Sequence, residues 1–250
     1  MQDSTELLSD PDTTTRPLAS DVALRLLGVV VAAVALNIMW LVLSQMDSLQ
    51  EFWPSHRTAW SDFKLLVTDG FQGVTLAAHV GATVGRVAFA LFVGGAIGGC
   101  IGAAVGSTRL SRNLADPFIS FMRLVTPAAV LTIAILARGL GEMPTLIATT
   151  LPIVWIIADA MSRGVVDVGF GRDLIRIHVV PAARTALLVA WIAVSFAETI
   201  SSSTGIGAAV WAARTFFRGG IVVSMLVVST LLFLVVDYLI RLLGRLASGE

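Results

Sequence analysis

Six long apolar runs follow one another along this 250-residue chain, and each approaches the length of a membrane-spanning helix. A bilayer core of about 30 Å takes about 20 helical residues to cross. The runs cover residues 26–43, 76–105, 117–137, 143–158, 185–203 and 219–236. Hydrophobic residues make up 56% of the chain and charged residues only 14%, which leaves too little polar surface for a soluble domain of this size. We therefore predict an all-α, polytopic membrane protein with about six transmembrane helices, rather than a soluble helical bundle.

The distribution of arginine and lysine predicts the orientation of these spans. If the N-terminus lies inside, the cytoplasmic segments hold ten basic residues, four of them in the segment 162–184, and the outer segments hold five. An excess of basic residues marks the cytoplasmic side of a membrane protein. We therefore expect both termini, and the segment 162–184 between the fourth and fifth spans, on the cytoplasmic side.

The first twenty residues differ in composition from the rest. They are acidic, rich in serine and threonine, and interrupted by proline, and they lack the positive start and apolar centre of a signal peptide. We expect a disordered cytoplasmic tail over 1–20 and a transmembrane domain over 21–250.

Small residues repeat at every fourth position of the second span, so they lie on one face of the expected helix. A face of glycine lets a second helix approach backbone to backbone. Tight helix packing is the simpler interpretation, and a conduit lined by bare backbone is the alternative. The glycines of this stripe are Gly94, Gly98, Gly102 and Gly106, and Ala90 precedes them.

Arg86 in the second span and Glu198 in the fifth are charges within apolar runs. At 1.5 Å per residue, both lie roughly 10 Å below the outer ends of their spans. A charge in hydrocarbon costs at least about 2.5–3.5 kcal/mol, so each needs a partner or water. An Arg86–Glu198 ion pair is one interpretation. Contact of Arg86 with an anionic substrate on the translocation path and snorkelling to the interface are the others.

Several classes of function find little support in the sequence. One cysteine, Cys100, excludes an intrachain disulfide, and three scattered histidines do not make a metal site. No basic tract predicts binding of nucleic acid, and no Gly-rich loop of the Lys-Ser/Thr type predicts an ATP site. An intramembrane protease would need a serine of 201–203 beside a histidine, and only His79 is expected on the same side of the membrane as those serines.

Four motifs, in order and at matching intervals over about 52–245, resemble the permease subunits of ABC importers of the nitrate, sulfonate, taurine and bicarbonate group. A segment before the second span resembles the group's Leu-Pro-Ser-Pro entry, and the second span resembles its His, Ser/Thr, Arg, Gly signature. The third and fourth spans follow the family pattern, and Glu198 with Gly205 and Gly207 match its Ala-Glu and Gly-x-Gly. The four segments read FWPSHRTAW, HVGATVGRVAFALFVGGAIG, MRLVTPAAVLTIAILARGLGEMPTLIATTLPIVW and FAETISSSTGIGAAVWAAR.

The resemblance implies a type I importer bundle in the bacterial inner membrane. It implies a second permease copy or paralogue, an extracytoplasmic substrate-binding protein, and a cytoplasmic ATPase that binds ATP-Mg while this chain binds no cofactor. It also implies that 162–184 holds a coupling helix that docks on the ATPase. The helix is expected to begin near Arg172 and to end, after about two turns, before Pro181. The residues expected to serve this coupling are Asp167, Gly169, Phe170, Gly171, Arg172, Asp173, Leu174, Ile175 and Pro181.

In the family this loop carries a Glu-Ala-Ala motif. The loop of this chain departs from that pattern, since the Ala-Ala pair of the motif is absent and about five residues are missing between Gly164 and Pro181. The leading hypothesis is a permease subunit that imports a small, anionic solute and docks on its ATPase through a remodelled helix. A non-transporting or regulatory membrane subunit, and the divergent half of a heterodimeric permease, are the alternatives.

Overall fold

The computed structural model describes residues 19–46 and 53–248. It divides into two compact units, Met1–Ser55 and His56–Glu250. The expected tail over 1–20 lies almost wholly outside the described residues. Within the described residues every regular element is helical, apart from one isolated bridge between Phe71 and Val74, so the chain is an all-α polytopic membrane protein.

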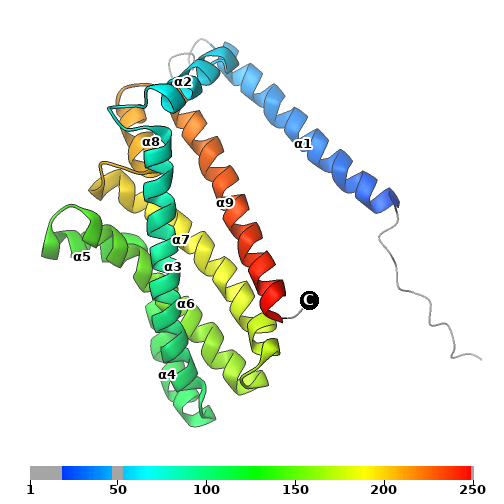
Figure 1. Ribbon diagram of the computed structural model, residues 1–250, viewed down its shortest axis with the longest axis vertical. Coiled ribbons are helices and arrows are strands. Elements are labelled where there is room, and N and C mark those ends of the chain that lie inside the picture. The colour runs from blue at the N-terminus through cyan, green and yellow to red at the C-terminus, as the bar shows by residue number, and fades with distance from the viewer. Residues whose placement is uncertain (1–18, 47–52, 249–250) are drawn as a thin grey trace, which may run out of the picture. The chain divides into compact units, whose positions relative to one another are not determined.

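The helices cover the six apolar runs in order, and the additional helices α2 and α8 lie between runs (Figure 1). Their bounds are α1 Ala19–Gln45, α2 His56–Thr68, α3 Leu76–Gly106, α4 Arg109–Leu124, α5 Pro127–Arg138, α6 Glu142–Val168, the π-helix η1 Leu174–Val179, α7 Val180–Ser201, α8 Ile206–Thr215 and α9 Gly219–Ser248.

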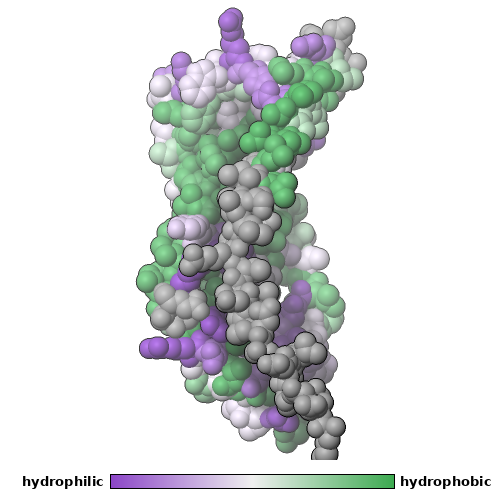
Figure 2. Space-filling model, turned by 90° about the vertical axis from the view of Figure 1, so that its right-hand side faces the viewer, coloured by the Kyte–Doolittle hydropathy of each residue, from purple (hydrophilic) through white to green (hydrophobic). Residues whose placement is uncertain are grey.

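Four of the helices in the described ranges are long and apolar enough to cross a membrane. They are α3, α6, the continuous helix Leu174–Ser201, and α9. The pair α4 and α5 makes a fifth span if it counts as one. The first expected span lies within α1, where Val34–Gln45 forms a shorter apolar stretch. Figure 2 shows that hydrophobic side chains (green) cover much of the visible surface, with hydrophilic ones (purple) gathered in separate patches.

The third expected span is not one straight helix, which corrects the sequence analysis. Its two parts, α4 and α5, meet at an angle of 79°. Val125 and Thr126 between them are extended, as a residue before proline prefers, and the Thr126 hydroxyl accepts a hydrogen bond from the Ala129 N–H. Pro127 then occupies the first turn of α5, where its missing N–H costs nothing. The fourth span also extends ten residues beyond its expected end, to Val168.

The glycine stripe of α3 packs against the backbone of α6, as the simpler interpretation predicts. A Cβ added to Gly102 would lie 2.5 Å from the Ala158 carbonyl oxygen, and one on Gly106 would lie 2.8 Å from that of Ser162. Gly94 and Gly98 face Thr150 and Val154 in the same way, one turn apart each time. The two helices therefore approach more closely than any side chain would permit.

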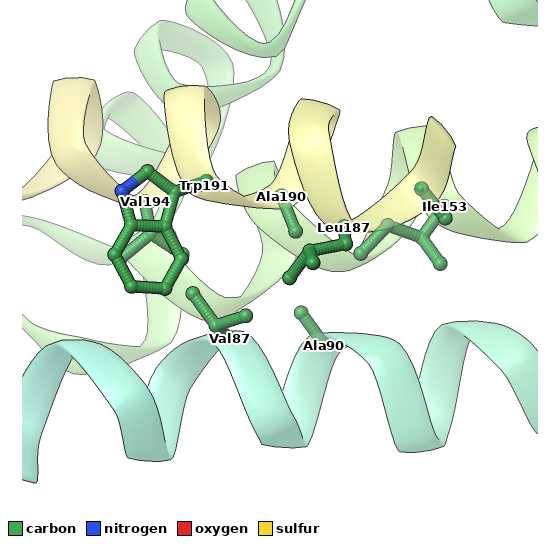
Figure 3. Packing of buried hydrophobic residues seen from close by; sticks show 8 residues of the cluster. Val87, Ala90, Ile153, Leu187, Ala190, Trp191 and Val194 are labelled. Atoms are coloured by element: carbon green, nitrogen blue, oxygen red, sulfur yellow. The ribbon is translucent and has the colours of Figure 1, made fainter. Parts of the chain in front are cut away.

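A small apolar core joins α3 and α6 to α7, and Figure 1 shows α3 in front of both. In Figure 3, Val87 and Ala90 of α3 face Leu187, Trp191 and their neighbours on α7. The Trp191 indole also donates a hydrogen bond to the Ser229 hydroxyl of α9 at 2.9 Å. This core holds the spans that carry the charged residues described below.

Candidate functional site

Arg86 is buried on α3, and its guanidinium joins three segments of the bundle. Its Nη1 donates two hydrogen bonds, one to Glu198 Oε1 of α7 at 2.7 Å and one to the Thr204 carbonyl oxygen at 2.7 Å. Its Nε donates to Glu142 Oε2, at the start of α6, at 2.9 Å. The expected ion pair between Arg86 and Glu198 is therefore present, and Glu142 is a second acidic partner that the sequence analysis missed.

Glu198 is fully buried, and neutral donors complete its hydrogen bonding. Its carboxylate accepts from the Thr83 hydroxyl at 2.9 Å and from the Gly207 N–H at 2.9 Å. Gly205 has φ +123°, and any Cβ there would overlap the Glu198 carboxylate. The Ile206 N–H donates to Thr83 at 2.8 Å, so the first turn of α8 is tied to this cluster. Both glycines of the Gly-x-Gly motif thus serve the burial of one carboxylate.

The charges of this cluster favour a structural role for Arg86 over contact with a substrate anion. Arg86 contributes one positive charge, and Glu198 with Glu142 contributes two negative charges, so an anion would meet a net negative group. All three guanidinium nitrogens already donate hydrogen bonds. A role for these residues on a translocation path stays a prediction.

A second buried carboxylate, Asp159 of α6, is surrounded by arginines and escaped the sequence analysis. It accepts from Arg112 at 3.2 Å and from Arg163 at 2.9 Å, and it also pairs with Arg123. Arg112 and Arg123 belong to α4, so the cluster fixes α4 to α6 at the end of the bundle opposite Glu198. The i,i+4 spacing of Asp159 and Arg163 was the only signal in the sequence.

The loop after α6 forms a tight helical hairpin. Gly169 ends α6 with φ +70°, Phe170 projects into the surroundings with 71% of its surface exposed, and a new helix begins at Arg172 as predicted. Arg172 and Asp173 are exposed at the start of that helix. The short turn at 169–171 is therefore the tip of the hairpin.

Two expectations for this loop are wrong. The helix does not end before Pro181 but continues through η1 into α7, forming one helix over Leu174–Ser201. A π-helical turn, in which the Val180 N–H donates to the Ile175 carbonyl oxygen, widens the helix just before the proline. Leu174, one of the residues expected to serve coupling, is also not available at the surface for docking, because it is buried against Gly164 of α6.

The serines and His79 form no catalytic pair among their described hydrogen bonds. His79 Nδ1 accepts from the Gly205 N–H at 3.1 Å, and Ser201 Oγ lies 2.5 Å from Thr145 Oγ1. The first contact ties α3 to the N-cap of α8, and the second ties α6 to the end of α7, both near the Glu198 cluster.

No protein-family model matches the chain, but individual proteins do. A probable ABC transporter permease protein of Brucella melitensis is 27% identical in an alignment of 192 positions that covers 68% of this chain and 77% of the relative. The taurine transport system permease protein TauC of Escherichia coli is 26% identical in an alignment of 196 positions that covers 70% of this chain and 71% of the relative. The Escherichia coli protein SsuC, named as an aliphatic sulfonates transport permease protein, is 32% identical in an alignment of 188 positions that covers 67% of this chain and 72% of the relative.

The identity to SsuC extends over most of both proteins, and the helices in the described ranges give the chain several membrane spans. The three relatives described above are transport permease subunits and not enzymes. The chain therefore belongs to the permease subunits of ABC transporters.

Proposed function

We propose that this permease forms, with a second permease subunit, the path by which a small anionic solute is imported. A cytoplasmic ATPase that binds ATP-Mg supplies the energy, and a substrate-binding protein on the outer side delivers the solute. The chain lies in the bacterial inner membrane with both termini in the cytoplasm. The relatives named for taurine and for aliphatic sulfonates favour an organic sulfonate as the solute class.

The observation that carries this proposal is the continuity of the hairpin with α7. From Leu174 to Ser201 the helix is unbroken, and at 1.5 Å per residue it spans roughly 40 Å. One end of this helix is joined to the exposed tip through Arg172 and Asp173, which are also helical, and the other end carries Glu198, which is bound to Arg86 of α3. A rigid element of this kind can carry a displacement from an ATPase at the hairpin to the opposite end of the bundle.

The proposed function is tested by purifying the complex and reconstituting it in nanodiscs. We expect the chain to co-purify with a second permease and an ATPase. ATP hydrolysis should rise when the loaded binding protein is added, with taurine or an alkanesulfonate as the solute. If the complex assembles but its rate of ATP hydrolysis does not change with binding protein and solute, the result would instead favour the alternative of a non-transporting, regulatory subunit. Mass spectrometry of the same complex distinguishes a homodimer from a pair with a related permease.

The exposed tip of the hairpin supplies the sharpest test of coupling. Phe170→Ala, or charge reversal at Arg172 or Asp173, should weaken ATPase association by about tenfold, because an interface side chain that matters is worth more than about 1 kcal/mol. The membrane domain should stay folded, since all three side chains are exposed. Association is measured by titrating the purified ATPase onto the permease in nanodiscs.

Phe92→Ala is the matched control for Phe170→Ala. Phe92 is 79% exposed, and it lies in the middle of the α3 span, far along the chain from any loop. The Phe92→Ala substitution removes the same phenyl group and leaves the residues of the hairpin unchanged. Normal association and stimulation in all three hairpin variants would mean that the ATPase docks elsewhere.

A further inference from the structure

α7 and α9 run in opposite directions, and side chains join them along the part nearer the hairpin. Arg184 Nε of α7 donates a hydrogen bond to Asp237 Oδ1 of α9 at 2.7 Å. Two turns further along α7, the Trp191 indole donates to the Ser229 hydroxyl at 2.9 Å, and its ring meets Phe233 edge-on with the centroids 5.8 Å apart. Figure 1 shows the two helices converging toward the end of the bundle that holds the hairpin. These halves of α7 and α9 are therefore fixed to each other.

Beyond Trp191 the same two helices border a gap of about 220 Å³, which we call the α7–α9 gap. Protein interiors contain few voids larger than a water molecule, so a space of this size between two packed helices is unusual. α8 borders the gap as well, so three helices surround it. The bordering residues used below are Thr199 of α7, Val210 of α8, and Val222 and Thr230 of α9.

The two walls of the gap are held by different helices. On the α7 side, Glu198 is bound to Arg86 of α3. On the α9 side, Arg218 pairs with Asp62 of α2 at 2.5 Å, and the Ser224 hydroxyl lies within hydrogen-bonding distance of an α2 carbonyl oxygen. Among the residues that the structure describes, no hydrogen bond or ion pair joins 195–201 of α7 to 219–228 of α9. The walls are therefore anchored separately, whereas the hairpin halves are anchored to each other.

α8 is attached to both walls. Its first turn belongs to the α7 side, because the Ile206 N–H donates to Thr83 and the Gly207 N–H donates to Glu198. Its later residues belong to the α9 side, where the buried Ala209 and Ala213 share an apolar cluster with residues of α2 and α9. A change in the width of the gap would therefore tilt α8.

Closing the gap would strand no threonine hydroxyl. Thr199 and Thr230 both border the gap, and their hydroxyls donate to carbonyl oxygens of their own helices at 2.7 and 2.9 Å. An unsatisfied buried donor costs free energy, and these two donors stay satisfied whether the gap is open or closed. Apolar contact across the gap would favour the closed state.

We propose that the α7–α9 gap closes and opens during transport, with α8 tilting between its two walls. This inference rests on the proposed function, because the hairpin must receive a displacement from the ATPase. The unbroken helix Leu174–Ser201 carries that displacement past Trp191, whose bond to Ser229 acts as the fulcrum. Hinged motions of this kind move rigid elements about a few fixed contacts.

Filling the gap tests the proposal in the whole complex, with the second permease, the ATPase and the loaded binding protein in nanodiscs. Val222→Phe places a phenyl ring in the gap from α9. The unfolding temperature should stay equal or rise, because the ring enters free space. ATP hydrolysis stimulated by the binding protein with taurine should fall about tenfold, because the ring overpacks the closed state and overpacking carries about that factor.

Val227→Phe is the matched control on the same helix. Its side chain is 48% exposed and does not border the gap, so stimulated hydrolysis should not change. An equal loss in both variants, or no loss in Val222→Phe, would overturn the proposal. Should Val222→Phe fail to fold, Val210→Phe takes its place, because Val210 borders the same gap from α8.

A distance measurement makes the result independent of turnover. Spin labels at Ile200→Cys and Val227→Cys, both exposed, report the separation of α7 and α9 by electron paramagnetic resonance in a Cys100→Ser background. We expect different distances in the nucleotide-free and ATP-bound complexes, and a single distance in Val222→Phe. One unchanged distance in the complex without the phenylalanine would mean a fixed groove filled by a lipid chain. If that complex shows no stimulation at all, the proposed function fails, and the two distances still decide whether the gap closes.

Discussion

Glu198→Ala is expected to lower the free energy of unfolding by about 3–5 kcal/mol, since it leaves the buried guanidinium of Arg86 without its fully buried partner. The loss also orphans the Thr83 hydroxyl and the Gly207 N–H, which both donate to this carboxylate. Thermal unfolding in nanodiscs, together with the yield of folded protein, measures the effect.

A double-mutant cycle isolates the ion pair from the rest of the cluster. Arg86→Ala should also destabilise the bundle, and the double substitution should cost clearly less than the sum of the two single changes. Additive losses would show that the two side chains do not interact. Glu142→Ala is the control on the same arginine, because its side chain is 59% exposed and a pair of that kind is worth about 1 kcal/mol or less.

The parts of this fold that the sequence predicts are those governed by periodicity and depth. Every fourth residue of α3 is small, and that spacing alone places Gly94 to Gly106 on one face of a helix. Counting residues from the ends of the spans puts Arg86 and Glu198 at one level, which makes their ion pair one of three possible interpretations of Arg86, and the structure shows that pair. Neither inference needs the position of any other helix.

The missed features depend on which helices lie side by side. Asp159 looks like the boundary of an apolar run, and only the packing of α4 on α6 brings Arg112 and Arg123 to it. Glu142 likewise lies at the boundary of an apolar run, and its hydrogen bond with Arg86 follows from the packing of α3 against α6. Partners that are 36–56 residues apart leave no periodic signal.

Proline shows why local rules alone misplace the loop. Pro127 does begin a new helix, because Thr126 before it caps that helix and the chain turns. Pro181 leaves its helix intact, because one π-helical turn shifts the hydrogen bonds and removes the clash with the preceding carbonyl groups. The two prolines differ in the backbone around them, and a residue count cannot separate these cases.

Gly98→Ala and Gly99→Ala should move the stability of the bundle in opposite directions, although they add the same methyl group one residue apart. A Cβ on Gly98 would overlap the Val154 carbonyl oxygen, whereas a Cβ on Gly99 meets nothing within 4 Å. Backbone cannot move aside as a flexible side chain can, so Gly98→Ala should force α3 away from α6 and cost about 1–3 kcal/mol.

Gly99→Ala should be neutral or stabilising by up to about 1 kcal/mol, which is the intrinsic helix preference of alanine over glycine. Thermal unfolding of both variants in the same nanodiscs provides the comparison. Equal stability of the two proteins would mean that α3 and α6 are not in backbone contact in the membrane. The continuous surface that Gly98 shares with Gly102 also predicts coupling: the Gly98→Ala, Gly102→Ala pair should cost less than the sum of its parts, because the first substitution already separates the helices that the second would push apart.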